Sequence, residues 1–207
     1  MLFLKRLMPD MPVYQTLAYI YIIAVILSNL SSNKITMFMG HEIDGGFLFF
    51  PLTYFVNDFV TENYGFRQAK SMIITAYVLN LLFFVGFLFV VHLPAADIWP
   101  YQDSMSAIFD LSPRIFIASA LAYFVGELLN SKLLTIFKVK LAGKFVYFRF
   151  LASTSIAALV ENSIFYMIVF YNVVEFPVLL NMMLMQYILK LLVEAIIAPS
   201  YYFFRRS

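Results

Sequence analysis

Several ionisable side chains stand inside long apolar stretches of this sequence, where an isolated charge is costly. A charged side chain at the centre of a bilayer costs about 2.5–3.5 kcal/mol on insertion scales, and such residues often mark a substrate or ion pathway. The residues in question are Lys34, Asp58, Glu62, Glu127, Glu161, Lys190 and Glu194. Because most of them are carboxylates, the sequence favours a site for a ligand that is cationic or rich in N–H donors.

The polar residues around these charges recur at helical spacing. Residues that are four apart lie on the same face of a helix, so each group forms a stripe. The stripes are Asn29 and Asn33; Tyr54, Asp58 and Glu62, with Asn57 and Thr61 beside them; Ser119, Tyr123, Glu127 and Asn130; Thr154, Ala158, Glu161, Asn162 and Phe165; and Gln186, Lys190 and Glu194. We expect the stripes of the different helices to converge on one interior cavity.

A purely structural role is the alternative for these side chains. Lys34, Glu62 and Glu194 lie near the ends of their apolar segments, where long side chains can extend to the membrane interface. Lys190 and Glu194 are also spaced for an ion pair within one helix. The sequence alone leaves both interpretations open.

The composition indicates that most of the chain is surrounded by lipid. Hydrophobic residues make up 63% of the 207 positions and charged residues 13%, against about 25% charged in a typical soluble domain. The mean hydropathy is +0.86. The net charge of +2 does not favour nucleic-acid binding, and the absence of cysteine excludes disulfides, thiolate metal ligands and a cysteine nucleophile.

The apolar segments predict an all-α membrane protein with six transmembrane helices, forming a single transmembrane domain over residues 1–207. A helix needs about 20 apolar residues to cross the hydrocarbon layer. The predicted spans are 15–35, 47–64, 70–92, 113–132, 148–171 and 178–203. The intervening segment 93–112 contains Pro94 and Pro100 and is interpreted as an external loop. No small-residue cleavage site follows the first apolar run, so we expect an uncleaved first span.

The second predicted span is the irregular one. It opens with Gly45-Gly46 and contains Pro51. This pattern fits either a partly re-entrant helix that presents backbone groups to a ligand, or an ordinary short helix kinked by proline. Glu62-Asn63 in this span matches Glu161-Asn162 in the fifth, which would fit a three-plus-three inverted repeat.

The basic residues predict the orientation in the membrane, because Lys and Arg concentrate in cytoplasmic loops. On the side of the two termini lie Lys5, Arg6, Arg67, Lys70, Lys132, Lys138, Lys140, Lys144, Arg149, Arg205 and Arg206. The opposite side carries Arg114 and the acidic residues Glu42, Asp44, Asp97, Asp103, Asp110 and Glu175. We therefore expect both termini in the cytoplasm.

Motifs for catalysis are missing from the sequence. His41 and His92 are its histidines, and both fall near the expected external boundary. There is no HExxH motif, no Ser–His pairing within the membrane and no Gly-rich phosphate loop. The sequence thus argues against an enzyme and indicates no metal or cofactor. Transport driven by a gradient or by partner subunits is what remains.

Nearly the whole sequence resembles a known family. The motifs are Asn29-x-x-x-Asn33-Lys34, Phe50-Pro51-Leu52-Thr53, Asn57-Asp58-x-x-x-Glu62-Asn63-Tyr64-Gly65, Glu127-Leu128-Leu129-Asn130 and Lys190 with Ala198-Pro199. They are similar to those of the queuosine precursor transporters, which were earlier grouped as putative vitamin uptake transporters. The chain departs from the family pattern at Asn130 and at Glu161-Asn162, where the family favours Asp.

The resemblance implies an inner-membrane carrier, without a cofactor, that imports 7-cyano- or 7-aminomethyl-7-deazaguanine for the tRNA nucleoside queuosine. Such a base offers N–H donors to a carboxylate, a carbonyl to Lys or Asn, and a flat face to aromatic rings. The candidate binding residues are Asn29, Asn33, Lys34, Tyr54, Asp58, Glu62, Tyr123, Glu127, Asn130, Glu161, Asn162 and Lys190. The main alternative is the substrate-binding membrane subunit of an ATP-driven energy-coupling complex; a channel is another. A homodimer is left open.

Overall fold

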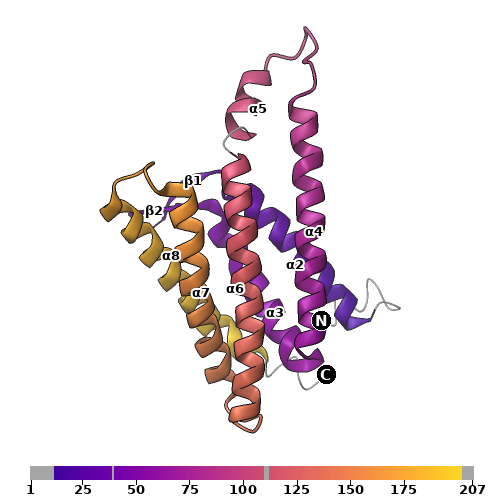
Figure 1. Cartoon of the computed structure of the whole chain (residues 1–207), viewed down its shortest axis with the longest axis vertical. Helices are drawn as coiled ribbons and strands as arrows, with labels where there is room; N and C mark the ends of the chain where they lie inside the picture. The colour runs from indigo at the N-terminus through magenta and orange to yellow at the C-terminus, as the bar shows by residue number, and fades with distance from the viewer. Residues whose placement is uncertain (1–11, 39, 110–111, 202–207) are drawn as a thin grey trace.

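The computed structural model describes residues 12–38, 40–109 and 112–201, which form a bundle of helices with one small hairpin (Figure 1). The helices are α2 (Val13–Ser31), α3 (Phe50–Tyr64), α4 (Phe66–Val91), α5 (Gln102–Phe109), α6 (Ser112–Lys140), α7 (Val146–Phe170) and α8 (Phe176–Ile197). The other elements are the strands β1 (Ile35–Phe38) and β2 (His41–Asp44) and the 3-10 helices η1 (Gly45–Leu48) and η2 (Ala198–Ser200). The residues used above for orientation that lie outside the described ranges are Lys5, Arg6, Asp110, Arg205 and Arg206.

Five helical segments of the described chain are long and apolar enough to cross a membrane. They are α2, α4, α7, α8 and the segment that contains α6. Each coincides with a predicted span, although α6 continues to Lys140 instead of ending near residue 132. The prediction of a multi-pass, predominantly helical membrane protein is confirmed.

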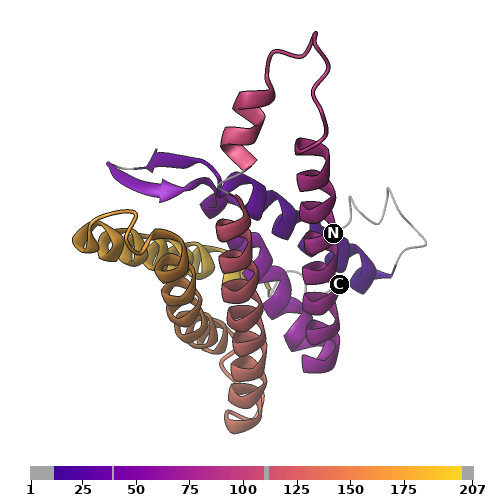
Figure 2. The ribbon, with the colours of Figure 1, turned by 45° about the horizontal axis from the view of Figure 1, so that its top comes forward.

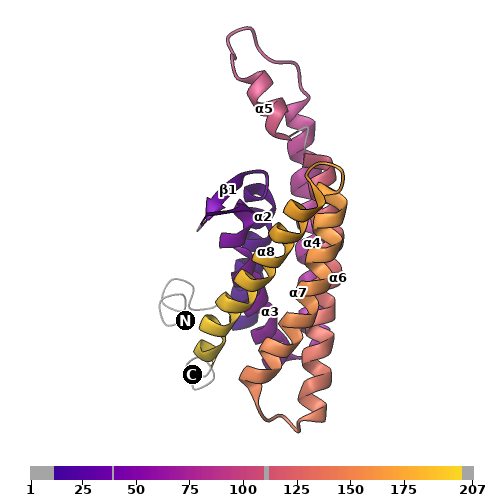
Figure 3. The same cartoon turned by 90° about the vertical axis from the view of Figure 1, so that its left-hand side faces the viewer.

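The remaining helix, α3, is shorter than a bilayer. Its 15 residues extend about 22 Å at 1.5 Å per residue, against a hydrocarbon thickness of about 30 Å. Pro51 lies in its first turn, where the missing N–H costs no hydrogen bond, so the proline starts the helix and does not kink it. Most of α3 is buried between the neighbouring helices, which it contacts on several sides (Figure 3).

A β-hairpin joins α2 to η1, and the all-α prediction missed it. β1 and β2 are antiparallel, with Ile35 opposite Asp44 and Phe38 opposite His41. The first predicted span was extended to residue 35, but α2 ends at Ser31. The alternating exposure of Ile-Thr-Met-Phe is typical of a strand. Figure 2 shows the hairpin projecting beside the helices.

The segment 93–112, predicted as a loop, contains the helix α5. This helix extends the long α4–α6 pair at one end of the molecule (Figure 1). Gln102 connects α5 to the end of α4, because its side-chain Nε2 donates to the main-chain oxygen of Val91 (2.9 Å). The prolines therefore predicted a connection between two helices correctly, but not the short helix within it.

The two ends of the bundle differ in charge. The α3–α4 turn and the α6–α7 connection lie toward one end, which we call the basic end because Arg67, Lys70, Lys140 and Lys144 are there (Figure 1). The hairpin, α5 and the α7–α8 turn lie toward the other end. α3 runs from the hairpin side to the basic end, so its polar stripe passes through much of the interior.

Candidate functional site

Three helices bring four of the predicted residues together in the interior. The Nζ of Lys190 on α8 donates to Glu161 Oε1 (2.7 Å) and Asn162 Oδ1 (3.0 Å) on α7. The hydroxyl of Tyr54 on α3 donates to the other carboxylate oxygen of Glu161. All four side chains are at most 5% exposed. We call Tyr54, Glu161, Asn162 and Lys190 the central cluster.

A second contact joins α3 to α6 beside the central cluster. The Nδ2 of Asn57 donates to the carboxylate of Glu127 and to its main-chain oxygen (3.2 Å). Ser131 Oγ in turn donates to Asn57 Oδ1 (2.7 Å). Asn57 was placed beside the predicted stripe and not among the binding candidates. In this structure it is the residue that positions Glu127.

Asp44 is a buried residue that the sequence analysis assigned to an outer loop. One oxygen of its carboxylate accepts from Ser32 Oγ (2.9 Å) and Gly46 N (3.0 Å), and the other accepts from the Tyr166 hydroxyl (3.2 Å). Burial raises the pKa of the Asp44 carboxyl above its usual value, while the Ser32 hydrogen bond and the charge of Lys190 act in the opposite direction.

Asp44 and three residues of the central cluster, Glu161, Asn162 and Lys190, line one narrow cavity of about 10 Å³. Its aromatic walls are Phe50, Tyr123, Phe165 and Tyr166, and its remaining lining residues are Ser119, Ala122 and Gln186 in addition to Asp44, Glu161, Asn162 and Lys190. Ser119 Oγ and Gln186 Oε1 are buried without a hydrogen-bond partner. The cavity thus combines two carboxylates, one ammonium group, unsatisfied polar atoms and flat rings.

A wider apolar groove leads to the same lysine from the side of the bundle. It has a volume of about 250 Å³ and lies between α8 on one side and the hairpin, η1 and α3 on the other. Pro51 and Leu52 form part of one wall and Leu189 and Val193 part of the other, with Lys190 among the lining residues. The groove and the cavity therefore share Lys190 and Gln186.

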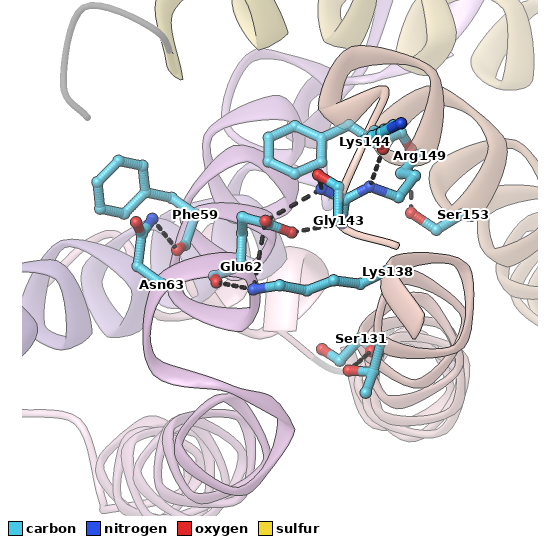
Figure 4. Close-up of polar contacts among 11 residues, drawn as sticks. Phe59, Glu62, Asn63, Ser131, Lys138, Gly143, Lys144, Arg149 and Ser153 are labelled. Carbon is cyan, nitrogen blue, oxygen red and sulfur yellow. Dashed lines mark hydrogen bonds and ion pairs between the residues drawn. The ribbon is translucent and has the colours of Figure 1, made fainter. Parts of the chain in front are cut away.

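Glu62 lies apart from the central cluster, in an ion-pair group at the basic end (Figure 4). Arg149 donates to both of its carboxylate oxygens, at 2.6 and 3.0 Å, and Lys138 Nζ lies 3.3 Å from Glu62 Oε1. Arg149 is completely buried and also donates to the main-chain oxygens of Gly143 and Lys144. These bonds tie the α6–α7 connection to the end of α3.

Asp58 and Asn130 form a further contact between the central cluster and the basic end. Asn130 Nδ2 donates to one carboxylate oxygen of Asp58, and both side chains are completely buried. Neither residue lines the cavity that contains Lys190. Glu194, one turn beyond Lys190 on α8, is buried nearby and its carboxyl group interacts with that of Asp58.

Three further predicted residues, Asn29, Asn33 and Lys34, are not brought to the cavity. Asn29 and Asn33 line a separate pocket, together with Asn80, between α2, α4, α5 and α6. Lys34 is exposed at the start of the hairpin. Tyr123 does line the cavity, as predicted, and packs near Tyr21 and Phe50.

Gly126 on α6 allows α7 to approach closely at the central cluster. A Cβ at this position would lie 2.9 Å from both Cβ and Oε2 of Glu161, closer than such atoms pack. We expect Gly126→Ala to displace Glu161 from Tyr54 and Lys190 and to lower the stability by about 1–3 kcal/mol, as overpacking does. Thermal denaturation of the purified protein in detergent would measure the loss.

Gly86→Ala is the matched control for Gly126→Ala. Gly86 lies within helix α4, and a Cβ there would meet nothing within 4 Å. Alanine should leave the stability unchanged or raise it slightly, because it restricts the unfolded chain. Equal denaturation temperatures for the two variants would contradict the close approach of α6 and α7.

Comparison with known proteins gives one family. No curated protein and no solved structure matches the chain. Residues 44–204 match the family model described as putative vitamin uptake transporter. The match includes α3 and α4 and all of α6, α7 and α8, and thus every residue of the central cluster. This chain, with its charged interior cavity among membrane-spanning helices, belongs to the putative vitamin uptake transporter family.

Proposed function

We propose that the protein is a carrier that imports 7-cyano- or 7-aminomethyl-7-deazaguanine, precursors of queuosine, across the cell inner membrane. The observation that carries the proposal is the cavity in which Lys190 faces two carboxylates, Asp44 and Glu161, between aromatic walls. A deazaguanine has a matching set of groups: adjacent N–H donors, a carbonyl oxygen and a flat ring system.

The two carboxylates have different parts in this proposal. Glu161 already accepts from Lys190 and Tyr54, whereas Asp44 accepts from hydroxyl groups and one backbone N–H. A carboxylate can accept two parallel N–H donors from one edge of a base, and charge-assisted hydrogen bonds of this kind are strong. Asp44 takes the donor edge, while Lys190 turns toward the carbonyl and Tyr166 or Phe50 stacks on the ring.

Substrate enters through rearrangement of the helices around α3. The cavity is narrow, and the groove between α3 and α8 reaches the same lysine. We propose six crossings with both termini in the cytoplasm, α3 being the short crossing, so that the basic end faces the cytoplasm. The Glu62–Arg149 ion pair then closes the cytoplasmic side while the cavity is loaded from outside.

Uptake by cells that cannot make queuosine tests the site. We expect Asp44→Asn and Glu161→Gln each to lower precursor uptake by at least about tenfold, since loss of a charge-assisted hydrogen bond costs about 1.5–3 kcal/mol. The readout is the queuosine content of tRNA after the precursor is added at low concentration, normalised to the amount of protein in the membrane.

The control for these variants is Glu175→Gln, which removes an exposed carboxylate at the start of α8. Its uptake should equal that of the wild type. If Asp44→Asn and Glu161→Gln also take up the precursor normally, the proposed site is wrong. If uptake needs added ATPase subunits, the protein is instead the membrane subunit of an energy-coupling complex.

A further inference from the structure

Four buried oxygen atoms near the middle of the bundle lack a hydrogen-bond donor. They are Asp58 Oδ2, Asn130 Oδ1 and both carboxylate oxygens of Glu194. The three side chains come from α3, α6 and α8 and are at most 2% exposed. Buried acceptors without a donor are uncommon in folded proteins because each carries an uncompensated desolvation cost. Their convergence therefore calls for a ligand that supplies positive charge or a proton.

Helix geometry explains why these groups meet. Asp58 is one turn beyond Tyr54 on α3, and Glu194 is one turn beyond Lys190 on α8. Tyr54 and Lys190 both bind Glu161, so α3 and α8 lie side by side and their next turns face each other as well. Asn130 on α6 holds Asp58 through its Nδ2, and Glu194 on α8 is near enough to Asp58 for their charges to act on each other.

No described cation neutralises this carboxyl pair. The charged groups that act on Asp58 from the surrounding helices are Glu62 on α3, Glu127 on α6 and Glu194 on α8. In the part of the chain that the structure describes, Lys190 pairs with Glu161, and Arg149 and Lys138 pair with Glu62. Two adjacent carboxylates in a buried site are not both ionised without a compensating charge.

We propose that Asp58 and Glu194 form the binding site of the coupling cation, a proton shared between the two carboxyl groups. A proton needs no space beyond the two oxygens that share it. Calcium and magnesium ions take about six or more oxygen ligands, which exceeds the four free oxygens here. Asn130 is a positioning residue, because its amide holds the Asp58 carboxyl toward Glu194.

The site is placed to couple proton binding to substrate binding. Each of the helices α3 and α8 carries one residue of the central cluster and, one turn further along, one residue of the carboxyl pair. A shift of either helix that loads the cavity therefore also changes the separation of Asp58 and Glu194. The transported solute in this inference rests on the proposed function; the protonated carboxyl pair does not.

Proteoliposomes that contain the full chain separate coupling from translocation. With 7-cyano-7-deazaguanine as the probe, the wild type should accumulate the base when a proton gradient is directed inward. Asp58→Asn and Glu194→Gln should lose this accumulation but still exchange external labelled base for internal unlabelled base. Glu175→Gln should retain both activities, since its carboxylate is exposed.

Infrared spectroscopy tests the shared proton without any substrate. The wild type in lipid at neutral pH should show the carbonyl-stretch band of a protonated carboxylic acid. Asp58→Asn/Glu194→Gln should lower its intensity, and other buried carboxyl groups such as that of Glu127 account for what remains. Glu175→Gln should not change the band. Equal bands in the wild type and the double variant would overturn the proposal, whatever the transport assay shows.

The transport outcomes distinguish the two hypotheses. Accumulation that depends on a sodium gradient and not on the proton gradient would overturn the proton site. The proposed carrier function would still stand. Normal exchange by the wild type, with accumulation that responds to neither gradient, would also overturn the proton site. If the wild type exchanges no deazaguanine at all, the proposed function fails, and the infrared band alone then decides whether the carboxyl pair holds a proton.

Discussion

Replacing Lys190 with methionine should abolish deazaguanine uptake. Lys190 is the cation that lines the cavity, where it pairs with Glu161 and lies 4.8 Å from the ring centre of Phe50. Methionine keeps most of the side-chain volume but removes the charge and its donors. The carbonyl of the base then has no partner, and Glu161 becomes a buried carboxylate without its ion pair. Initial rates of uptake, normalised to membrane protein, measure the effect.

A double variant separates binding from folding in this experiment. Breaking a buried ion pair by removing one partner costs about 3–5 kcal/mol, whereas removing both partners is much better tolerated. We expect Glu161→Gln/Lys190→Met to recover the stability that Lys190→Met loses. The double variant should still not take up the deazaguanine. Recovery of uptake as well would mean that the pair is only structural. Lys140→Met, at an exposed position of α6, should behave like the wild type.

Removing Arg149 should produce the largest loss of stability. Its guanidinium is completely buried, forms two bonds to Glu62 and binds two main-chain oxygens of the α6–α7 connection. Arg149→Met leaves Glu62 with Lys138, whose side chain is 42% exposed. We expect a loss of about 3–5 kcal/mol. Glu62→Gln/Arg149→Met should recover much of it, and thermal denaturation would measure both.

The same double variant tests whether the ion pair closes the cytoplasmic side. The chain has no cysteine, so a single one can be introduced as a probe. Ser153→Cys places it one turn from Arg149 on α7, at a completely buried position. A membrane-impermeant maleimide should label this cysteine faster from the cytoplasmic side when Glu62→Gln/Arg149→Met is also present. Equal labelling rates would contradict the closing role.

Helical spacing was sufficient to predict four polar residues that meet in the interior. Tyr54, Glu161, Asn162 and Lys190 were selected because polar residues recur at turn intervals in apolar segments, and the structure brings them into contact. The spacing of a stripe does not say which neighbour it faces. Asn29 and Asn33 form a stripe as well, but α2 directs it toward a pocket with α4 and α6.

Charge counting misplaced two buried residues. Asp44 and Arg149 were counted as loop charges because each lies at the edge of an apolar segment, but they are 1% and 0% exposed. Asp44 is buried because the hairpin and η1 fold back against the end of α2: a Cβ at Gly46 would lie 2.3 Å from Ser32 Oγ. Such a fold-back depends on tertiary contacts, and the short strands that produce it left no clear periodic signal.

We propose that this chain alone, without partner subunits, carries a deazaguanine base through the cavity around Lys190. The most direct measurement is uptake of labelled 7-cyano-7-deazaguanine into liposomes that contain only this protein and no ATP. We predict saturable uptake that unlabelled 7-aminomethyl-7-deazaguanine inhibits competitively and that Glu161→Gln/Lys190→Met lacks. Uptake that does not saturate, or that requires ATPase subunits, would contradict the claim.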